Sequence, residues 1–178
     1  MAFCNKLLPL ALALCLVASS STTEALKTKV TRLQFFLHDN AGIPNPDTIP
    51  VARRLDNFTS SNPIDAAFGN VFVRDTPLTL TPDINSTLIG RSQGIVAISS
   101  HLNEASLFTA VTFVFNVPFN GSSISVVGRN AFMNEVREMP IVGGTGIFRL
   151  ARGFLFARTH STDSVDPVIG YNVTILHY

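Results

Sequence analysis

The stretch GRNAFMNEVREMPIVGGTGIFRLARG, residues 128–153, carries the densest group of structural signals in the chain. Gly143, Gly144 and Gly146 surround Thr145, and such a cluster requires a backbone that turns tightly or adopts positive φ. The apolar pair Ile147-Phe148 follows at once, so we expect a structural turn between two ordered elements. The alternative is a phosphate-binding loop, but the segment lacks the Lys-Ser/Thr of a P-loop and the spacing of a dinucleotide fingerprint.

Short apolar segments separated by turn signals lie on both sides of this stretch. The clearest is a hairpin of residues 107–117 and 122–127, because its connection contains Asn120-Gly121, the strongest short hairpin signal. Other strands are expected over residues 31–38, 49–52, 69–74, 88–99, 148–159 and 168–178, and polar loops over 39–50, 55–65 and 160–167. The pattern predicts an all-β barrel or sandwich, and periodicity alone does not choose between them.

Three details describe the expected sheet further. Pro77 cannot donate to a ladder, so pairing should stop or bulge after residues 69–74. Gly90 and Gly94 indicate bends of the kind that a barrel wall needs. Neither face of residues 107–117 is clearly polar, which favours a closed sheet whose outside packs on another protomer.

Residues 1–25 are predicted to be a secretory signal. Lys6 precedes an apolar run over residues 7–17 that is too short to span a bilayer, and small residues then allow cleavage between about Ser20 and Ala25. Residues 26–178 would form a single domain. We therefore expect a secreted protein, with N-glycosylation at the sequons of Asn57, Asn85, Asn120 and Asn172, of which Asn172 is the weakest because it falls in a predicted strand.

The composition narrows the function. Both cysteines, Cys4 and Cys15, fall in the predicted signal, so the mature domain would have no disulfide or thiol nucleophile. The signal contains one residue of each charge, so the net charge stays at +1, which attracts neither nucleic acid nor an anionic membrane. Only 14% of residues are charged, which favours a homo-oligomer that covers apolar surface.

Few residues stand out as candidates for chemistry. The histidines are scattered without metal-site spacing and no GxSxG elbow occurs, so we expect no metal or cofactor. Asp39 follows an apolar strand and precedes a Gly/Pro loop, which places it at a barrel mouth. Partial removal from water there would favour a protonated carboxyl that donates near neutral pH, whereas the alternative is a turn-capping Asp. Arg137 beside Glu138 could equally form a surface ion pair.

The segment VREMPIVGGTGIFRLARG resembles the signature of plant dirigent proteins. Further segments resemble the family in the same order and cover nearly all of the chain after residue 30: FFLHD at 35–39, DTPLT at 75–79 with IGRSQG at 89–94, and YNV at 171–173 with a terminal His177-Tyr178. The resemblance implies an eight-stranded antiparallel β-barrel, related to that of allene oxide cyclase, closed at one end and assembled as a trimer.

The resemblance also implies site residues. In the family the Asp that matches Asp39 lines the pocket, and the Arg that matches Arg137 points into it to bind a phenolic or quinone oxygen. Asn130, in Gly-Arg-Asn, stands where lignan-forming members have the Asp of Gly-Ala-Asp. Because Asn cannot supply a proton at neutral pH, this departure points to another branch of the family. Val96 replaces a frequent Tyr and Gly170 a frequent Glu, while Asp75 is expected to anchor a turn.

The implied function is stereochemical control of plant phenol coupling. A separate oxidase, a laccase or peroxidase, would make phenoxy radicals from phenolic substrates such as coniferyl alcohol, and the cavity would orient them toward an optically active lignan. On this reading the protein is a non-oxidising auxiliary. One alternative is a lyase of the pterocarpan synthase type, which removes water from an isoflavanol through a quinone methide. Another is an apoplastic defence or cell-wall protein that binds phenolics without defined chemistry.

Overall fold

The computed structural model describes residues 27–40, 42, 44–56, 58–101, 105–161 and 167–178. In this part of the chain, nine strands occur with two short helical segments. The elements in order are β1 (Lys29–His38), β2 (Thr48–Ala52), α2 (Pro63–Ala67), β3 (Val71–Thr79), β4 (Leu88–Ile98), β5 (Leu107–Phe115), β6 (Ser123–Asn130), β7 (Arg137–Thr145), the 3-10 segment η1 (Gly146–Phe148), β8 (Arg152–Ser161) and β9 (Val168–His177).

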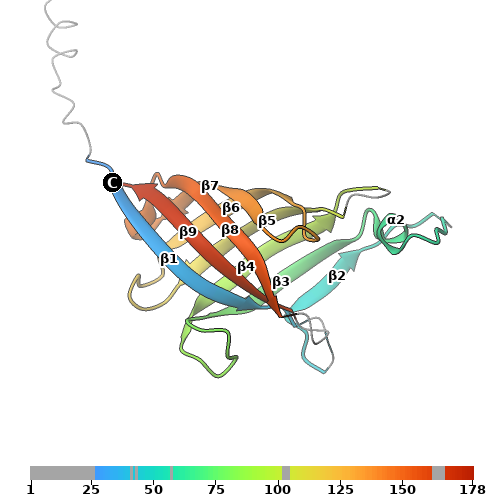
Figure 1. Cartoon of the computed structure of the whole chain (residues 1–178), viewed down its shortest axis with the longest axis horizontal. Helices are drawn as coiled ribbons and strands as arrows, with labels where there is room; N and C mark the ends of the chain where they lie inside the picture. The colour runs from blue at the N-terminus through green and yellow to red at the C-terminus, as the bar shows by residue number, and fades with distance from the viewer. Residues whose placement is uncertain (1–26, 41, 43, 57, 102–104, 162–166) are drawn as a thin grey trace, which may run out of the picture.

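The strands form one antiparallel sheet that closes on itself. Its order is β1-β9-β8-β7-β6-β5-β4-β3-β2, and β1 also pairs with β3 through Phe36 opposite Thr79 and Leu37 opposite Leu78. This pairing makes a barrel of β1 and β3 to β9, while β2 extends the free edge of β3. Figure 1 shows the C-terminus at one end of the barrel and α2 beyond the other. The prediction of an eight-stranded antiparallel barrel is confirmed.

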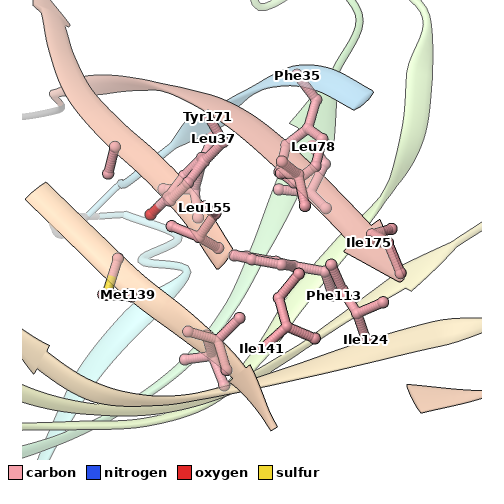
Figure 2. Packing of buried hydrophobic residues seen from close by; sticks show 14 of the residues in the cluster. Phe35, Leu37, Leu78, Phe113, Ile124, Met139, Ile141, Leu155, Tyr171 and Ile175 are labelled. Carbon is pink, nitrogen blue, oxygen red and sulfur yellow. The ribbon is translucent and has the colours of Figure 1, made fainter. Parts of the chain in front are cut away.

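The barrel interior is packed with side chains from alternate strand positions, as a two-residue period requires. Phe35 lies at the centre, edge-on to Phe113 and Phe115 at ring-centroid distances of 5.3 and 5.7 Å. Figure 2 shows this core, in which the hydroxyl of Tyr171 points away from Phe35 and toward the side where Met139 lies. On β5, Val111, Phe113 and Phe115 are buried, which confirms the face that the alternation assigns to them.

One end of the barrel is filled by aromatic rings, and we call this group the aromatic plug: Phe115, Phe119, Phe148 and His177. Phe148 is fully buried and lies 5.2 Å from Phe119, 5.3 Å from His177 and 6.0 Å from Phe115, measured between ring centroids. The contacts of Phe148 with Phe115 and His177 are edge-to-face and that with Phe119 is tilted, and such aromatic packing adds to the stability gained by burial.

The glycine cluster differs in detail from the predicted turn. Gly143, Gly144 and Thr145 continue β7, and only Gly146 has a positive φ, of 62°. The chain turns through η1, which begins at Gly146, so β8 starts at Arg152 and not at Phe148. A side chain at Gly146 would collide with Ser122, so the sequence signal marked a close backbone approach at this residue.

Two further predictions were wrong at the level of element bounds. β3 continues through Pro77 to Thr79, so the predicted strand end is wrong, but the pairing of β3 with β4 does shift register between Leu78 and Thr79. The amide of Asp75 donates to the carbonyl of Asp47 on the β2 side of β3. The nitrogen of Pro77, two residues further on, faces the same side, in the gap between the pairings with β2 and with β1. No hydrogen-bond donor is needed there, so proline is tolerated. The predicted loop over residues 55–65 contains the start of α2, because Asn62 caps the amide of Ile64 and Pro63 occupies the first turn.

Gly94 marks a close approach of β4 to β5, and the predicted bends at Gly90 and Gly94 stay predictions. The φ of Gly94 is 150°, and an added side chain would collide with the carbonyl of Ala110 on β5. The predicted signal segment, residues 1–25, lies outside the described residues. Within the described residues, no helix has the length and apolar character needed to cross a bilayer.

Candidate functional site

The half of the barrel opposite the aromatic plug holds a cavity of about 420 Å³, within the range of about 300–1,000 Å³ that small-molecule sites occupy. Most of its wall is apolar and comes from Phe72, Val96, Ile98, Leu107, Val111, Phe113, Val126, Phe132, Met133, Met139, Pro167 and Ile169. The polar side chains on the wall are Asp39, Thr48, Arg74, Thr109, Asn130, Arg137, Thr159 and Tyr171. The three predicted site residues, Asp39, Asn130 and Arg137, therefore line one cavity.

Asp39 lies immediately after β1 and is held by two donors. A nitrogen of the Arg74 guanidinium contacts Oδ2, and the Thr48 hydroxyl donates to Oδ1 at 2.7 Å. Both oxygens thus accept hydrogen bonds, one of them from a cation. The role of Asp39 as a proton donor stays a prediction.

Arg137 opens β7 and is 4% exposed. Its Nη1 donates to the carbonyl of Phe132 at 3.0 Å and to the hydroxyl of Thr159 at 2.9 Å, whereas Nε and Nη2 are buried without a hydrogen-bond partner. Burial lowers the pKa of Arg137, because the charged guanidinium is removed from water. The alternative of a surface ion pair with Glu138 is wrong, since Arg137 points into the barrel and Glu138 is exposed.

Three further polar atoms on the wall have no partner within the described part of the chain: Nε of Arg74, and one atom each on Asn130 and Thr109. Asn130, at the end of β6, is 8% exposed and its Oδ1 is buried without a donor. Thr109 on β5 is 4% exposed and its hydroxyl is also unpaired. Buried polar groups are normally satisfied, so a cluster of unsatisfied ones around a cavity marks it as a candidate ligand site.

Tyr171 connects the cavity with the core. Its ring packs on Phe35 and Phe113 at centroid distances of 5.5 and 5.3 Å, while its side chain also lines the cavity. Burial raises the pKa of the Tyr171 phenol, and the charges of Arg74 and Arg137 act in the opposite direction. The Tyr171 phenol is therefore neutral at physiological pH and close to both guanidinium groups.

The sequence did not single out Arg74, Thr48 and Thr109. One signal was available for Arg74, because the strict alternation of β3 places it on the inward face with Thr76 and Leu78. A charged residue at an inward strand position is unusual and marks either an internal ion pair or a ligand site.

The other predicted positions lie in different surroundings. Val96 lines the cavity, as expected, and its replacement of a polar side chain keeps that wall dry. Gly170 is not part of the cavity wall, since a side chain there would contact the ring of Phe36 at 3.2 Å. Asp75 is exposed within β3 and accepts from Arg91, so it holds an ion pair and anchors no turn.

Three of the four sequons fall within the described residues. Asn85 and Asn120 are exposed in connections between strands, positions that suit a glycan. Asn172 is also exposed but lies within β9, opposite Gln34 of β1 and Phe156 of β8. Asn57 lies outside the described residues. Within the same limits, no three His, Cys, Asp or Glu side chains gather where they could hold a metal ion.

Comparison with known proteins agrees with this architecture. The family model described as dirigent-like protein matches residues 30–176 of the chain, which includes every strand of the barrel. The chain belongs to the dirigent family. Its relatives include both proteins named as dirigent proteins and proteins named as pterocarpan synthases, at similar identity.

Two relatives and one solved structure illustrate this. Dirigent protein 23 of Arabidopsis thaliana is 47% identical over 157 residues, covering 86% of this chain and 81% of the relative. Pterocarpan synthase 1 of Glycine max is 41% identical over 167 residues, covering 89% and 87%. The solved structure of the pterocarpan synthase dirigent protein GePTS1 has a TM-score of 0.77 at 37% identity, covering 87% of this chain and 88% of that one.

Proposed function

We propose that this dirigent protein directs the stereochemistry of phenol coupling without oxidising the phenol itself. A separate laccase or peroxidase would generate the phenoxy radicals, and the cavity would fix the face on which they meet. The observation that carries the proposal is the cavity of about 420 Å³, whose wall is largely apolar and bears a few unsatisfied polar atoms.

The chemistry of coupling suits such a site. Two phenoxy radicals combine with little barrier of their own, so the property that solution lacks is orientation. An apolar wall excludes water and packs against an aromatic ring, while the free donors of Arg137 and the free acceptor of Asn130 can hold its oxygens. Asn130 cannot act as an acid, which supports a member outside the typical lignan-forming branch.

The contacts of Asp39 favour this function over one that needs Asp39 as an acid. Its two oxygens are engaged by Arg74 and Thr48, an arrangement that holds Arg74 in place on the cavity wall. In this proposal Asp39 and Arg74 shape and polarise the wall, and no proton transfer from Asp39 is required.

The test is coupling of coniferyl alcohol by a laccase with and without the protein, followed by chiral chromatography of the dimers. We expect an enantiomeric excess that disappears in Arg137→Met and persists in the matched control Arg158→Met, since Arg158 lies on the outside of β8 with 57% of its side chain exposed. Racemic dimers from the wild-type protein with coniferyl alcohol and with the corresponding acid would refute the proposal.

A second function is favoured by the similarity to pterocarpan synthases, both in sequence and in fold. In this case the protein would remove water from an isoflavanol and close the ring through a quinone methide. Arg137 and Asn130 would hold the developing oxygen charge, and Asp39 would have to release Arg74 to protonate the leaving hydroxyl. Conversion of a 2′-hydroxyisoflavanol without any oxidant, lost in Asp39→Asn, would favour this function over radical coupling.

We also propose that the protein acts as a secreted homotrimer in the apoplast. Large apolar side chains are exposed on the outer face of several strands, including Val73 on β3, Ile95 on β4, Val127 on β6 and Phe154 on β8. Neighbouring exposed apolar groups of this kind support burial against other copies. Light scattering of the purified secreted protein tests the trimer, and a monomer at micromolar concentration would contradict it.

A further inference from the structure

We propose that the preferred guest of the cavity carries a carboxylate, so that a hydroxyaryl propenoic acid is bound in preference to the neutral alcohol. The inference rests on the proposed function, because it names the substrate class of the same cavity. It is carried by the hydrogen-bonding geometry of Arg137 and by the balance of charge on the cavity wall.

The free donors of Arg137 have the geometry of a carboxylate site. Nη1 is occupied by the Phe132 carbonyl and the Thr159 hydroxyl, and these two bonds fix the plane of the guanidinium. The unpartnered donors are Nε and Nη2, whose N–H bonds lie along the same edge of the group. That edge matches the two oxygens of a carboxylate in a bidentate pair with two parallel bonds, whereas a single phenolic oxygen can accept both donors only through a shared, more bent pair of bonds.

The charges of the wall require one more anion. Its ionisable residues that are charged at neutral pH are Asp39, Arg74 and Arg137. Asp39 and Arg74 form an ion pair and neutralise each other, but Arg137 is 4% exposed and its hydrogen-bond acceptors in the described residues are both neutral. A buried cation without a counter-ion is unfavourable, so a monoanionic guest would remove this penalty.

The remaining wall fits the rest of such a molecule. Apolar residues such as Val111, Val126 and Met139 offer a surface for one aromatic ring. Asn130 has a free acceptor, Oδ1, which suits the O–H of a phenol. A hydroxyaryl propenoic acid presents both groups at opposite ends of a flat skeleton, so one molecule can meet Arg137 with its carboxylate and still offer a phenol for coupling.

The first experiment compares three ligands with the same aromatic ring by calorimetry at pH 7: 4-hydroxy-3-methoxycinnamic acid, its methyl ester and coniferyl alcohol. The ester keeps the two oxygens but removes the charge. We expect the acid to bind at least about tenfold more tightly than either neutral ligand, as befits a pair of charge-assisted hydrogen bonds. Equal or tighter binding of the ester or the alcohol would overturn the inference.

The second experiment locates the preference. In Arg137→Met we expect affinity for the acid to fall at least about tenfold while affinity for the ester changes less than about threefold. Arg137→Lys keeps the charge but loses the fork, so an intermediate value is expected, and Arg158→Met should behave as the wild type. A full acid preference in Arg137→Met would also overturn the inference. Thermal unfolding of each variant verifies that it is folded.

The proposed substrate class and the proposed coupling function can be refuted separately. If coniferyl alcohol binds as tightly as the acid and its radicals couple with an enantiomeric excess, the substrate class is wrong and the coupling function stands. If the acid binds selectively but neither phenol couples with stereoselectivity, the carboxylate site stands and the coupling function falls. If none of the three ligands binds, both proposals fall.

Discussion

The two ends of the barrel are made from the same strands but are filled in opposite ways. Along β5, Phe115 belongs to the aromatic plug, whereas Thr109 and Val111 line the cavity. Along β9, His177 packs on the plug and Tyr171 on the cavity. At the plug the rings meet one another and only Nδ1 of His177 lacks a partner among the described residues, whereas the cavity wall retains several polar atoms without partners.

This contrast separates stability from function within one sheet. The plug buries aromatic surface in edge-to-face contacts, which stabilises the closed barrel. The cavity lacks such packing, and a guanidinium, an amide oxygen and a hydroxyl on its wall have no hydrogen-bond partner among the described residues. This arrangement lowers the stability of the protein until a ligand binds. Substitutions at the two ends should therefore have different and measurable consequences.

The largest effect is expected in the plug. Phe148 is fully buried among three rings, so Phe148→Ala should lower the free energy of unfolding by about 3–5 kcal/mol through lost burial and a new cavity. Phe72→Ala is the matched change at the other end, where Phe72 is half-buried and borders a cavity that already exists. For it we expect a loss of about 1–2 kcal/mol. Urea denaturation of both variants measures the difference, and equal losses would remove the distinction between the ends.

The sequence predicted the barrel and much of this contrast. Strict alternation in β5 and the Asn120-Gly121 turn fixed the clearest hairpin, because both signals are local. The three predicted site residues line one cavity even though they come from β6, β7 and the end of β1. The similarity to a known family supplied that placement, since no short-range pattern links residues so far apart in the chain.

The features that the sequence did not reveal depend on contacts between distant strands. The partners of Asp39 are Thr48 and Arg74, and only the closed sheet brings them together. Pro77 is tolerated within β3 because it faces the gap between the pairings of β3 with β2 and with β1. Gly146 likewise depends on a distant residue, because Ser122 lies where a side chain would be. Local propensity cannot decide such cases, because the deciding atom belongs to another strand.

A second prediction separates the two arginines of the cavity. Arg74→Met leaves the Asp39 carboxylate without its ion pair, and because Asp39 is 22% exposed we expect a loss of about 1–3 kcal/mol in the free energy of unfolding. Arg137→Met removes a buried charge that has no counter-ion, so stability should be unchanged or higher by up to about 2 kcal/mol.

The comparison is made by urea denaturation at pH 7 in the absence of ligand, with Arg158→Met as the surface control. A marked destabilisation by Arg137→Met would mean that its bonds to Phe132 and Thr159 matter more for folding than the cost of burying its charge. In that case Arg137 would serve the stability of the barrel more than the function of the cavity.

The smallest effect concerns Tyr171, which lines the cavity and packs on the core rings Phe35 and Phe113. Burial raises the pKa of its phenol above the ordinary value of about 10. Above pH 10 the unfolded chain loses this proton while the folded chain retains it, so stability should fall as pH rises from about 10 toward the folded pKa. The slope for one proton is at most about 1.4 kcal/mol per pH unit.

This prediction is isolated by comparing the wild type with Tyr171→Phe, because other groups that titrate in the same range are common to both proteins. The difference between their free energies of unfolding should be constant below about pH 9. Above that pH the difference should change, because titration of Tyr171 lowers the stability of the wild type alone. In a Tyr178→Phe background, phenolate absorbance follows Tyr171 directly, since the chain has two tyrosines. A flat difference up to pH 11 would mean that the charges of Arg74 and Arg137 offset burial, and that Tyr171 behaves as part of the cavity and not of the core.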